Sequence, residues 1–282
     1  MKGFIITGAA SGLGWATVQE LAKRFDGQAV HFGLVDFDRE GLAKNAAVLR
    51  QDGFEVSEFV ADLSSEAEVA ELVAGLQEAF PSVDLLVNNA GITHRSVSTQ
   101  TSNAVIRRVM AVDYHAPVEL AQGLHAALAA AGGTVINISS MAGWMPVLGR
   151  AGYCAAKSAL HQYFETFREE VREDGIKVLM VYPSFVRTNI EANALSGDGG
   201  RAKHKQSTLG KVQTPQWMAN RIISAWLAGK ERLFPTDKTL LGAWLYRLWP
   251  KLFMKQMVRN FQVELDVARA NREALGSEAS KG

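Results

Sequence analysis

Two serines, a tyrosine and a lysine lie close together in the segment from Ser139 to Lys157. Tyr153 and Lys157 are four residues apart, so on a helix from about Ala151 they share one face and their side-chain tips are within reach of each other. An ammonium beside a phenol favours the phenolate, which lowers the pKa of tyrosine from its ordinary value of about 10. A tyrosine altered in this way can act as a general acid or base. The segment therefore predicts a proton-transfer site.

A glycine-rich loop follows the apolar run Phe4-Ile5-Ile6-Thr7 and precedes a helical pattern from Trp15 to Phe25. Strand, glycine loop and helix in this order bind phosphate, because glycine lets the backbone approach a pyrophosphate and the helix N-terminus attracts its charge. The spacing is Gly-x-x-x-Gly-x-Gly, so a plain glycine-rich turn is the alternative. The loop residues that we expect at a dinucleotide are Gly8, Ser11, Gly12, Leu13 and Gly14.

A carboxylate ends the second apolar run, which extends from Ala29 to Val35 and is followed by Asp36. About twenty residues beyond a glycine loop, a carboxylate can accept hydrogen bonds from the ribose of an adenosine, and it repels a 2′-phosphate. The glycine loop itself contains no Arg or Lys. The sequence therefore favours NAD over NADP as the cofactor, while a role of Asp36 in capping the next helix is compatible with the same position.

Apolar runs alternate with amphipathic helical patterns along the chain, which predicts an α/β fold. We expect a single Rossmann-like, doubly wound parallel sheet with helices on both faces. Its ligands should bind beyond the carboxyl ends of the strands, where the motif residues fall. The runs expected to form strands lie near Phe4, Val30, Val56, Leu85, Val135, Val178 and Leu233.

From Lys2 to Pro235 the chain resembles the short-chain dehydrogenase/reductase family. The family's Thr-Gly-x-x-x-Gly-x-Gly is matched from Thr7 to Gly14, and its Asn-Asn-Ala-Gly from Asn88 to Gly91. Its catalytic serine falls on Ser140, thirteen residues before Tyr153. The resemblance implies that Tyr153 exchanges the proton of the substrate oxygen and that Lys157 also holds the nicotinamide ribose. Further cofactor contacts implied by the resemblance are Asp62, Leu63, Asn89, Ala90, Gly91, Pro183, Val186 and Thr188.

One position departs from the family pattern: Asp113 stands where the family carries an asparagine that completes a catalytic tetrad. The family asparagine holds a water that relays protons from the lysine to solvent. An aspartate could hold the same water, but its negative charge near Lys157 would weaken the pull of that lysine on Tyr153. We therefore count Asp113 among the catalytic residues, with an altered pH dependence as the alternative.

Composition excludes several other classes of protein. A chain of 282 residues with net charge +1 gives no electrostatic reason to bind nucleic acid. Its single cysteine, Cys154, cannot form an internal disulfide, and the first apolar run is too short for a signal peptide, so we expect a cytoplasmic protein. No spacing of Cys, His and carboxylates predicts a metal site.

Three later segments bear on the substrate. The apolar stretch from Met141 to Leu148 is expected to line a substrate pocket, which favours a lipophilic substrate, although packing against helices explains each residue as well. His94 and Arg95 are expected at the rim of that pocket. Residues 189–214, rich in Gly, Ser and Lys, are expected to form a lid that closes on the substrate or, alternatively, a solvated loop.

The tail contains an apolar segment, residues 240–254, that Arg247, Pro250 and Lys251 interrupt. It is too short to span a bilayer. We expect it to cover the substrate pocket or a neighbouring subunit, and peripheral membrane contact is the alternative, because Trp and Tyr beside Arg and Lys are typical of membrane interfaces. The expected organisation is a catalytic domain of residues 1–235 and an apolar helical C-terminal extension of residues 236–282, in a homodimer or homotetramer.

These expectations combine into one function: hydride transfer between NAD(H) and a lipophilic secondary alcohol or ketone. The chain is therefore expected to be an alcohol dehydrogenase or carbonyl reductase. The alternative is a nucleotide-binding sensor or scaffold with the same fold and impaired catalysis, for which Asp113 is the motivating residue.

Overall fold

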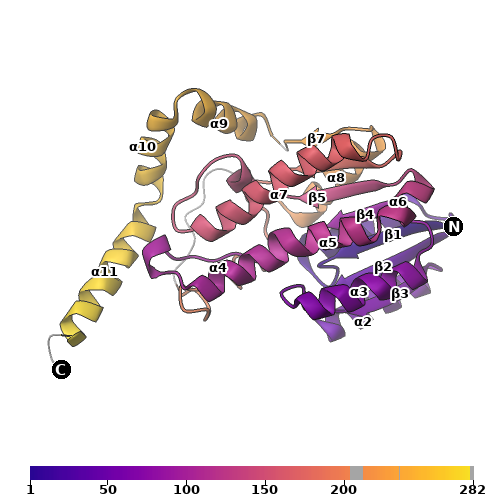
Figure 1. The fold of residues 1–282 in the computed structure, drawn as a ribbon, viewed down its shortest axis with the longest axis horizontal. Coiled ribbons are helices and arrows are strands. Elements are labelled where there is room, and N and C mark those ends of the chain that lie inside the picture. Colours follow the sequence, from indigo (N-terminus) through magenta and orange to yellow (C-terminus); the bar gives the residue numbers. More distant parts are fainter. Residues whose placement is uncertain (204–211, 235, 280–282) are drawn as a thin grey trace.

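Seven parallel strands form one sheet in the computed structural model, which describes residues 1–203, 212–234 and 236–279. The strand order is β3-β2-β1-β4-β5-β6-β7, and the chain crosses from one half of the sheet to the other between β3 and β4 (Figure 1). Each expected strand is present, so the predicted α/β fold with a doubly wound sheet is confirmed. The strands are β1 (Lys2–Thr7), β2 (Val30–Asp36), β3 (Glu55–Val60), β4 (Leu85–Asn88), β5 (Thr134–Ile138), β6 (Lys177–Val181) and β7 (Arg232–Leu233).

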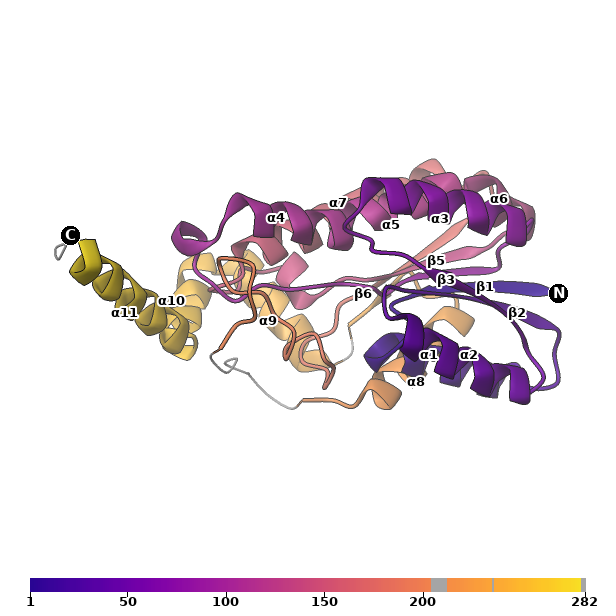
Figure 2. The ribbon, with the colours of Figure 1, turned by 90° about the horizontal axis from the view of Figure 1, so that it is seen from below.

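Helices cover both faces of the sheet (Figure 2). One face carries α1 (Gly12–Arg24), α2 (Arg39–Gln51) and α8 (Pro215–Leu227). The other face carries α3 (Glu66–Ala79), α4 (Asn103–Met110), α5 (Ala116–Gly123), α6 (His125–Ala131) and α7 (Ala151–Glu170). Because both faces are covered, β1, β2, β4 and β5 read as nearly continuous apolar runs, and their residues are almost all buried.

Side-chain caps fix where several helices begin. The carboxylate of Asp38 accepts a hydrogen bond from the Gly41 amide at the start of α2, and the hydroxyl of Ser65 accepts one from the Glu68 amide at the start of α3. Such caps satisfy amides that have no partner inside the helix. The caps therefore fix the residue at which α2 begins after the β2 loop and the residue at which α3 begins after the β3 loop.

Between α4 and α5 the helix widens into a π-helical turn, η2 (Ala111–His115). Pro117 explains the change, because proline has no amide to donate to the carbonyl of Asp113 and its ring collides with that carbonyl in a regular helix. The helix therefore continues through wider turns over these residues. Asp113, at the centre of the turn, is fully buried.

Three helices follow the sheet: α9 (Asp237–Leu248), α10 (Pro250–Asn260) and α11 (Gln262–Ala279). They lie at the end of the molecule where the carboxyl ends of the strands lie, away from the N-terminus (Figures 1 and 2). None of the helices in the described part of the chain is long and apolar enough to cross a membrane.

Candidate active site

A cleft of about 540 Å³ opens along the carboxyl ends of the strands. It contains nearly all the residues that sequence analysis assigned to a cofactor and to catalysis, although they come from segments far apart in the chain. Gly14, Lys157 and Asp113 are not on its surface. The expected site residues that line it are Gly8, Ser11, Gly12, Leu13, Asp36, Asp62, Leu63, Asn89, Ala90, Gly91, Ser140, Tyr153, Pro183, Val186 and Thr188.

The glycine loop has the shape that a dinucleotide phosphate requires. Gly8 and Gly12 have φ angles of +70° and +57°, a region that side chains disfavour. A side chain on Gly14 would collide with the carbonyl oxygen of Gly8, so this glycine lets helix α1 begin directly under the loop. A Cβ on Gly12 would lie 3.4 Å from Thr188 across the cleft. The glycines therefore keep open a cradle that a pyrophosphate fits, at a helix N-terminus that attracts its charge.

Thr7 and Asn89 join the ends of β1 and β4. The Thr7 hydroxyl accepts hydrogen bonds from the amides of Asn89 and Ala90, each 3.0 Å long. In return, the side-chain amide of Asn89 donates to the carbonyl of Thr7 at 2.9 Å. These bonds hold the floor of the cleft rigidly at the point where the chain crosses between the two halves of the sheet.

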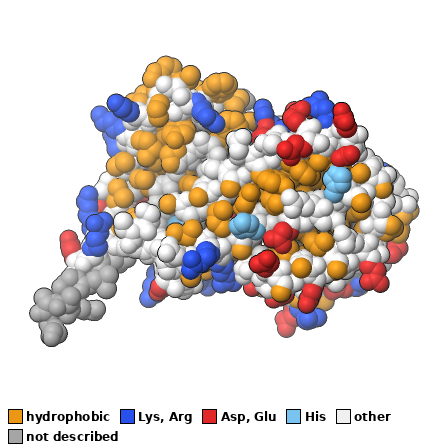
Figure 3. Space-filling view, in the orientation of Figure 1, with side chains coloured by type: hydrophobic (Ala, Val, Ile, Leu, Met, Phe, Trp, Pro, Cys, Tyr) orange, Lys and Arg blue, Asp and Glu red, His pale blue; other side chains and the backbone are white. Residues whose placement is uncertain are grey.

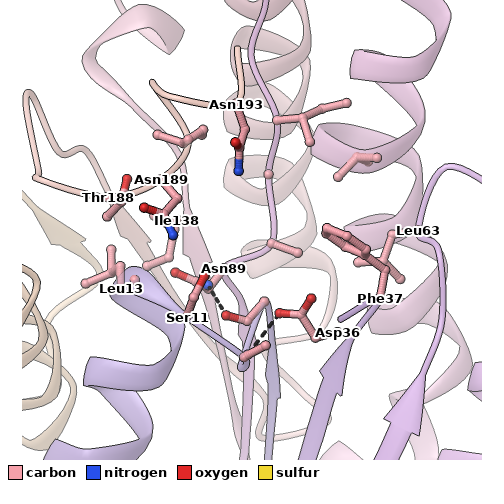
Figure 4. Close-up of a pocket in the computed structure, with 18 of the residues that line it drawn as sticks. Ser11, Leu13, Asp36, Phe37, Leu63, Asn89, Ile138, Thr188, Asn189 and Asn193 are labelled. Carbon is pink, nitrogen blue, oxygen red and sulfur yellow. Dashed lines mark hydrogen bonds between the residues drawn. The ribbon is translucent and has the colours of Figure 1, made fainter. Parts of the chain in front are cut away.

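Asp36 projects into the cleft from the end of β2. One carboxylate oxygen accepts a 2.9 Å hydrogen bond from the Ala10 amide of the glycine loop, and the other accepts from the Asp38 amide (Figure 4). Phe37 beside it is 74% exposed and borders the cleft opposite Leu63. Its exposed ring offers a flat apolar surface that suits a purine.

The side chain and the backbone amide of Asp62, close to the end of β3, both form hydrogen bonds with nearby residues. One of its carboxylate oxygens accepts from both the amide and the hydroxyl of Ser64. Its own backbone amide donates to Glu68 at 2.8 Å. The loop after β3 is therefore held in a fixed shape where it borders the cleft.

Ser140 and Tyr153 meet at the inner end of the cleft. Both side chains line the cleft, and the Ser140 hydroxyl accepts a hydrogen bond from the Ala142 amide at 3.1 Å. The pKa of Tyr153 is raised, first because burial disfavours the phenolate and then because of the negative charge of Asp113; the nearby Ser140 hydroxyl opposes the rise. The expectation that Lys157 would lower this pKa is wrong for this arrangement.

The reason is the position of the lysine. The Nζ atom of Lys157 lies 5.9 Å from the centre of the Tyr153 ring and donates to the Ile138 carbonyl at 3.0 Å. It also lies 3.2 Å from Oδ2 of Asp113, with both side chains almost fully buried. The lysine charge is thus shared with a carboxylate and a carbonyl instead of being directed at the phenol.

Both carboxylate oxygens of Asp113 contact groups in the interior of the protein. Oδ1 accepts a 2.8 Å hydrogen bond from the Ile92 amide, and Oδ2 faces Lys157. Burial raises the pKa of Asp113, while Lys157 and the Ile92 amide act in the opposite direction. Where the family carries an asparagine, this chain therefore has a carboxylate in direct, buried contact with Lys157.

A second buried charged cluster was not foreseen as a unit. The Glu191 carboxylate accepts two hydrogen bonds from Arg150, at 3.0 and 2.8 Å, and one from Arg95 at 2.9 Å. Both arginine side chains are less than 10% exposed. Arg150 immediately precedes helix α7, which carries Tyr153, so the cluster joins that helix to the segment after Thr188. Sequence analysis did not predict this cluster because Arg95 and Glu191 lie far apart along the chain.

His94 is also buried and not at the pocket rim. Its Nε2 accepts from the Gly152 amide in the first turn of α7 at 3.0 Å, and its Nδ1 is 3.2 Å from the Ser96 hydroxyl. Burial, and secondarily Arg150, lower the pKa of His94 to about 4. The expected position of His94 and Arg95 at the rim is therefore wrong: both support the cleft from behind.

The expected lid is described over residues 189–203 and 212–214, and its first part is anchored to the loop after β4. The Arg95 amide donates to the Leu195 carbonyl, and the Leu195 amide donates to Thr93. Asn189, Ile190, Asn193 and Leu195 border the cleft (Figure 4). Residues 204–211 of the expected lid lie outside the described residues.

The apolar surface of the cleft comes from residues other than those expected. The side chains of Met145, Val147 and Leu148 pack against the C-terminal helices, and no residue from Met141 to Leu148 borders the cleft. This part of the sequence-based interpretation is wrong, because the tail covers the segment. The apolar residues that do border the cleft include Ile92, Val112, Ile138, Ile190 and Leu195.

Comparison with known proteins agrees with this site. Residues 2–198 match the short chain dehydrogenase family. The chain is 30% identical over 268 residues to "Dehydrogenase/reductase SDR family member 7B" of Bos taurus, covering 92% of this chain and 81% of the relative.

Two solved structures are similar to most of this chain. A short-chain dehydrogenase from Sphingobium yanoikuyae, in complex with NADPH, has a TM-score of 0.72 at 25% identity, covering 83% of this chain and 88% of that chain. The bulky-bulky ketone specific alcohol dehydrogenase from Comamonas testosteroni has a TM-score of 0.70 at 25% identity, with 83% and 86% covered. With the cleft, the Ser140–Tyr153 pair and the buried lysine, these matches show that the chain belongs to the short-chain dehydrogenase/reductase family and is an NAD(P)-dependent oxidoreductase.

Proposed function

We propose that this protein interconverts a lipophilic secondary alcohol and its ketone and prefers NAD(H) to NADP(H). The observation that carries the proposal is that the hydroxyls of Ser140 and Tyr153 line the same cleft, which apolar side chains also border. Two hydroxyls at one oxygen of the substrate supply orientation and a proton. An apolar surround favours a carbonyl or alcohol carbon with hydrocarbon substituents.

The protein's part in the reaction is to bind the substrate oxygen and to move its proton. The Ser140 hydroxyl donates a hydrogen bond to that oxygen, and Tyr153 gives a proton to it in ketone reduction or takes one in alcohol oxidation. A bound nicotinamide supplies or accepts the hydride. Thr188, across the cleft from Gly12, would hold the nicotinamide end of the cofactor, as the family resemblance implies.

The raised pKa of Tyr153 bears on the direction of the reaction. A protonated phenol is ready to act as an acid, so reduction of the ketone proceeds from the form of Tyr153 that dominates near neutral pH. Oxidation of the alcohol needs the phenolate and therefore speeds up as pH rises. The buried Asp113 strengthens this bias, since its charge opposes that of the phenolate.

The preference for NAD is supported by the groups at the end of β2. Asp36 and Asp38 border the cleft there, and the Asp36 carboxylate lies against the glycine loop, where a ribose would meet it. Two carboxylates at this point disfavour a 2′-phosphate. The Sphingobium yanoikuyae enzyme was solved with NADPH, so the preference belongs to these residues of this chain and not to the fold.

A panel of aliphatic and aromatic ketones, assayed by the loss of absorbance of NADH and of NADPH, tests the proposal. We expect turnover to rise with the size of the apolar substituents and to be faster with NADH at equal concentrations. The reverse reaction with the matching alcohols should need a more alkaline pH. Turnover of small polar carbonyl compounds alone, or an equal rate with both cofactors, would contradict the substrate class or the cofactor preference respectively.

A further inference from the structure

The C-terminal helices α9 and α10 have one buried side and one exposed apolar side. On the buried side, Phe253 and Met257 pack against Met145, Val147 and Leu148. The guanidinium of Arg247 lies 5.4 Å from the ring centre of Trp144. These contacts fix the two helices on the body of the protein, close to the segment that follows Ser140.

The opposite side is open to solvent. Leu241, Trp244 and Leu248 of α9 are 69%, 57% and 57% exposed, at the spacing of one helical face. Trp249 and Leu252, at the junction with α10, are 59% and 57% exposed. We call these five residues the outer face. Figure 3 shows hydrophobic side chains gathered over this end of the molecule, with Lys and Arg side chains beside them.

Sequence analysis expected the segment to cover the substrate pocket or a neighbouring subunit; within this chain the outer face is exposed and does not border the cleft. A soluble protein seldom exposes so many large apolar side chains next to one another without a partner for them. The question is therefore which partner suits this surface.

Charge decides between the two obvious partners. Residues 240–260 contain four basic side chains, Arg247, Lys251, Lys255 and Arg259, and no Asp or Glu, although the whole chain has a net charge of only +1. A second copy of the chain paired through the same face would bring like charges together. An anionic lipid surface supplies the opposite charge, attracts each Lys or Arg, and accommodates Trp at the level of its headgroups.

From this geometry we infer that the outer face is a docking surface for an anionic phospholipid bilayer. The helices lie in the plane of the interface: Leu241, Trp244, Leu248, Trp249 and Leu252 enter the boundary between headgroups and acyl chains, and Lys251, Lys255 and Arg259 contact lipid phosphates. Spanning is not involved, since no described helix is long and apolar enough to cross the membrane. A lipophilic substrate dissolved in the bilayer would then be close to the cleft, a consequence that rests on the proposed function.

Cosedimentation with vesicles tests the inference without substrate or cofactor, so its outcome is independent of the proposed function. We expect the full chain to bind vesicles of phosphatidylcholine with phosphatidylserine and to bind phosphatidylcholine alone much more weakly. High salt should release it, because the phosphate contacts are screened. Equal binding to both kinds of vesicle, or to neither, would overturn the inference.

Two double variants separate the apolar and the charged contributions. Trp244→Ser with Trp249→Ser should lower the partition onto anionic vesicles by about tenfold or more, and Lys251→Gln with Lys255→Gln by about tenfold. The matched controls are Val48→Ser with Leu227→Ser, which changes exposed apolar residues elsewhere, and Lys23→Gln with Lys44→Gln, which changes exposed lysines on α1 and α2. Both controls should bind as the unmodified chain does.

The remaining outcomes are equally decisive. Since the changed side chains are exposed, the variants should keep the melting temperature of the unmodified chain. Quenching of tryptophan fluorescence by brominated lipid should disappear with Trp244 and Trp249 changed and should be unaltered in both control pairs. If vesicle binding is absent and sedimentation shows an oligomer that the Trp244→Ser and Trp249→Ser pair disperses, the outer face is an interface between copies and the membrane inference is wrong.

Discussion

The two sides of the cleft are built by different means. On the nucleotide side, the structure is held by hydrogen bonds between short side chains and the backbone. The Thr7 hydroxyl and the Asp36 carboxylate accept them from backbone amides, in the case of Asp36 from the glycine loop. On the substrate side, buried charged side chains hold the structure together. There Asp113 faces Lys157, and Glu191 joins Arg95 to Arg150.

This difference predicts how each side responds to mutation. A hydrogen bond to the backbone is short-range and partly replaceable by water at a half-exposed site, so its loss costs little. Removing one member of a buried charge pair leaves the other charged and desolvated, which costs much more. Substitutions on the substrate side should therefore have larger effects than those on the nucleotide side.

The largest effect is expected at the reacting hydroxyl. Tyr153→Phe removes only the oxygen that exchanges the proton, so kcat should fall by about 1000-fold, the usual scale of general acid–base catalysis. Affinity for NAD(H), measured by fluorescence titration, should stay within a few-fold. Tyr163→Phe is the matched control, because it makes the same change on the same helix at a hydroxyl that hydrogen-bonds Gln122 away from the cleft. A Tyr153→Phe enzyme with most of its activity would remove Tyr153 from the mechanism.

The next largest effect is expected at Asp113. Asp113→Ala leaves Lys157 buried without its carboxylate, and we expect a loss of about 100-fold in kcat together with lower stability. Asp113→Asn keeps an acceptor for the Ile92 amide and removes the charge, so most activity should remain.

The charge of Asp113 also predicts the direction in which the pH–rate profile should shift when this residue is changed. The negative charge of Asp113 raises the pKa of Tyr153, so the neutral side chain of Asn should lower it. Alcohol oxidation requires the phenolate, and the acidic limb of its pH–rate profile should therefore move to lower pH in Asp113→Asn. An unchanged profile would show that Asp113 does not act on Tyr153 through its charge.

Features that depend on neighbouring residues in the sequence were predicted, whereas features that depend on tertiary contacts were not. Most of the seven strands were predicted because they are short apolar runs that alternate with helical patterns, and the cofactor residues because they follow those runs directly. The place of Met145 was missed because only the tertiary position of the tail decides whether an apolar side chain lines a cleft or lies beneath a helix. The direction of the Tyr153 pKa shift was missed because burial and the charge of Asp113 raise this pKa, and Lys157 is paired with Asp113.

A smaller effect is expected at Glu191, which joins the substrate segment to helix α7. Glu191→Gln weakens the contacts with Arg95 and Arg150, so the segment from Asn189 to Leu195 should fit the substrate less well. We expect KM to rise by about tenfold, kcat to change little and the free energy of unfolding to fall by about 2 kcal/mol.

The control for Glu191 is Glu169→Gln, which alters an exposed pair with Arg172. Exposed ion pairs contribute little, so this variant should match the unmodified protein in KM and melting temperature. If both variants behave alike, the buried cluster has no special role in shaping the substrate side.

The smallest effect is expected on the nucleotide side, at Asp36. Asp36→Ala removes a half-buried hydrogen-bond acceptor for the ribose, a loss of about 1 kcal/mol, and so should raise the Kd for NAD by about fivefold. The Kd for NADP should fall, because the charge that repels a 2′-phosphate is gone. Asp52→Ala, at the far end of α2, removes an equal charge outside the cleft and should change neither value. The carboxylate also accepts from the Ala10 amide, so a loosened glycine loop would weaken both cofactors together. Opposite movement of the two Kd values therefore identifies a ribose partner, whereas a parallel rise would mean that Asp36 acts only by holding the loop, and the proposed preference for NAD would need another source.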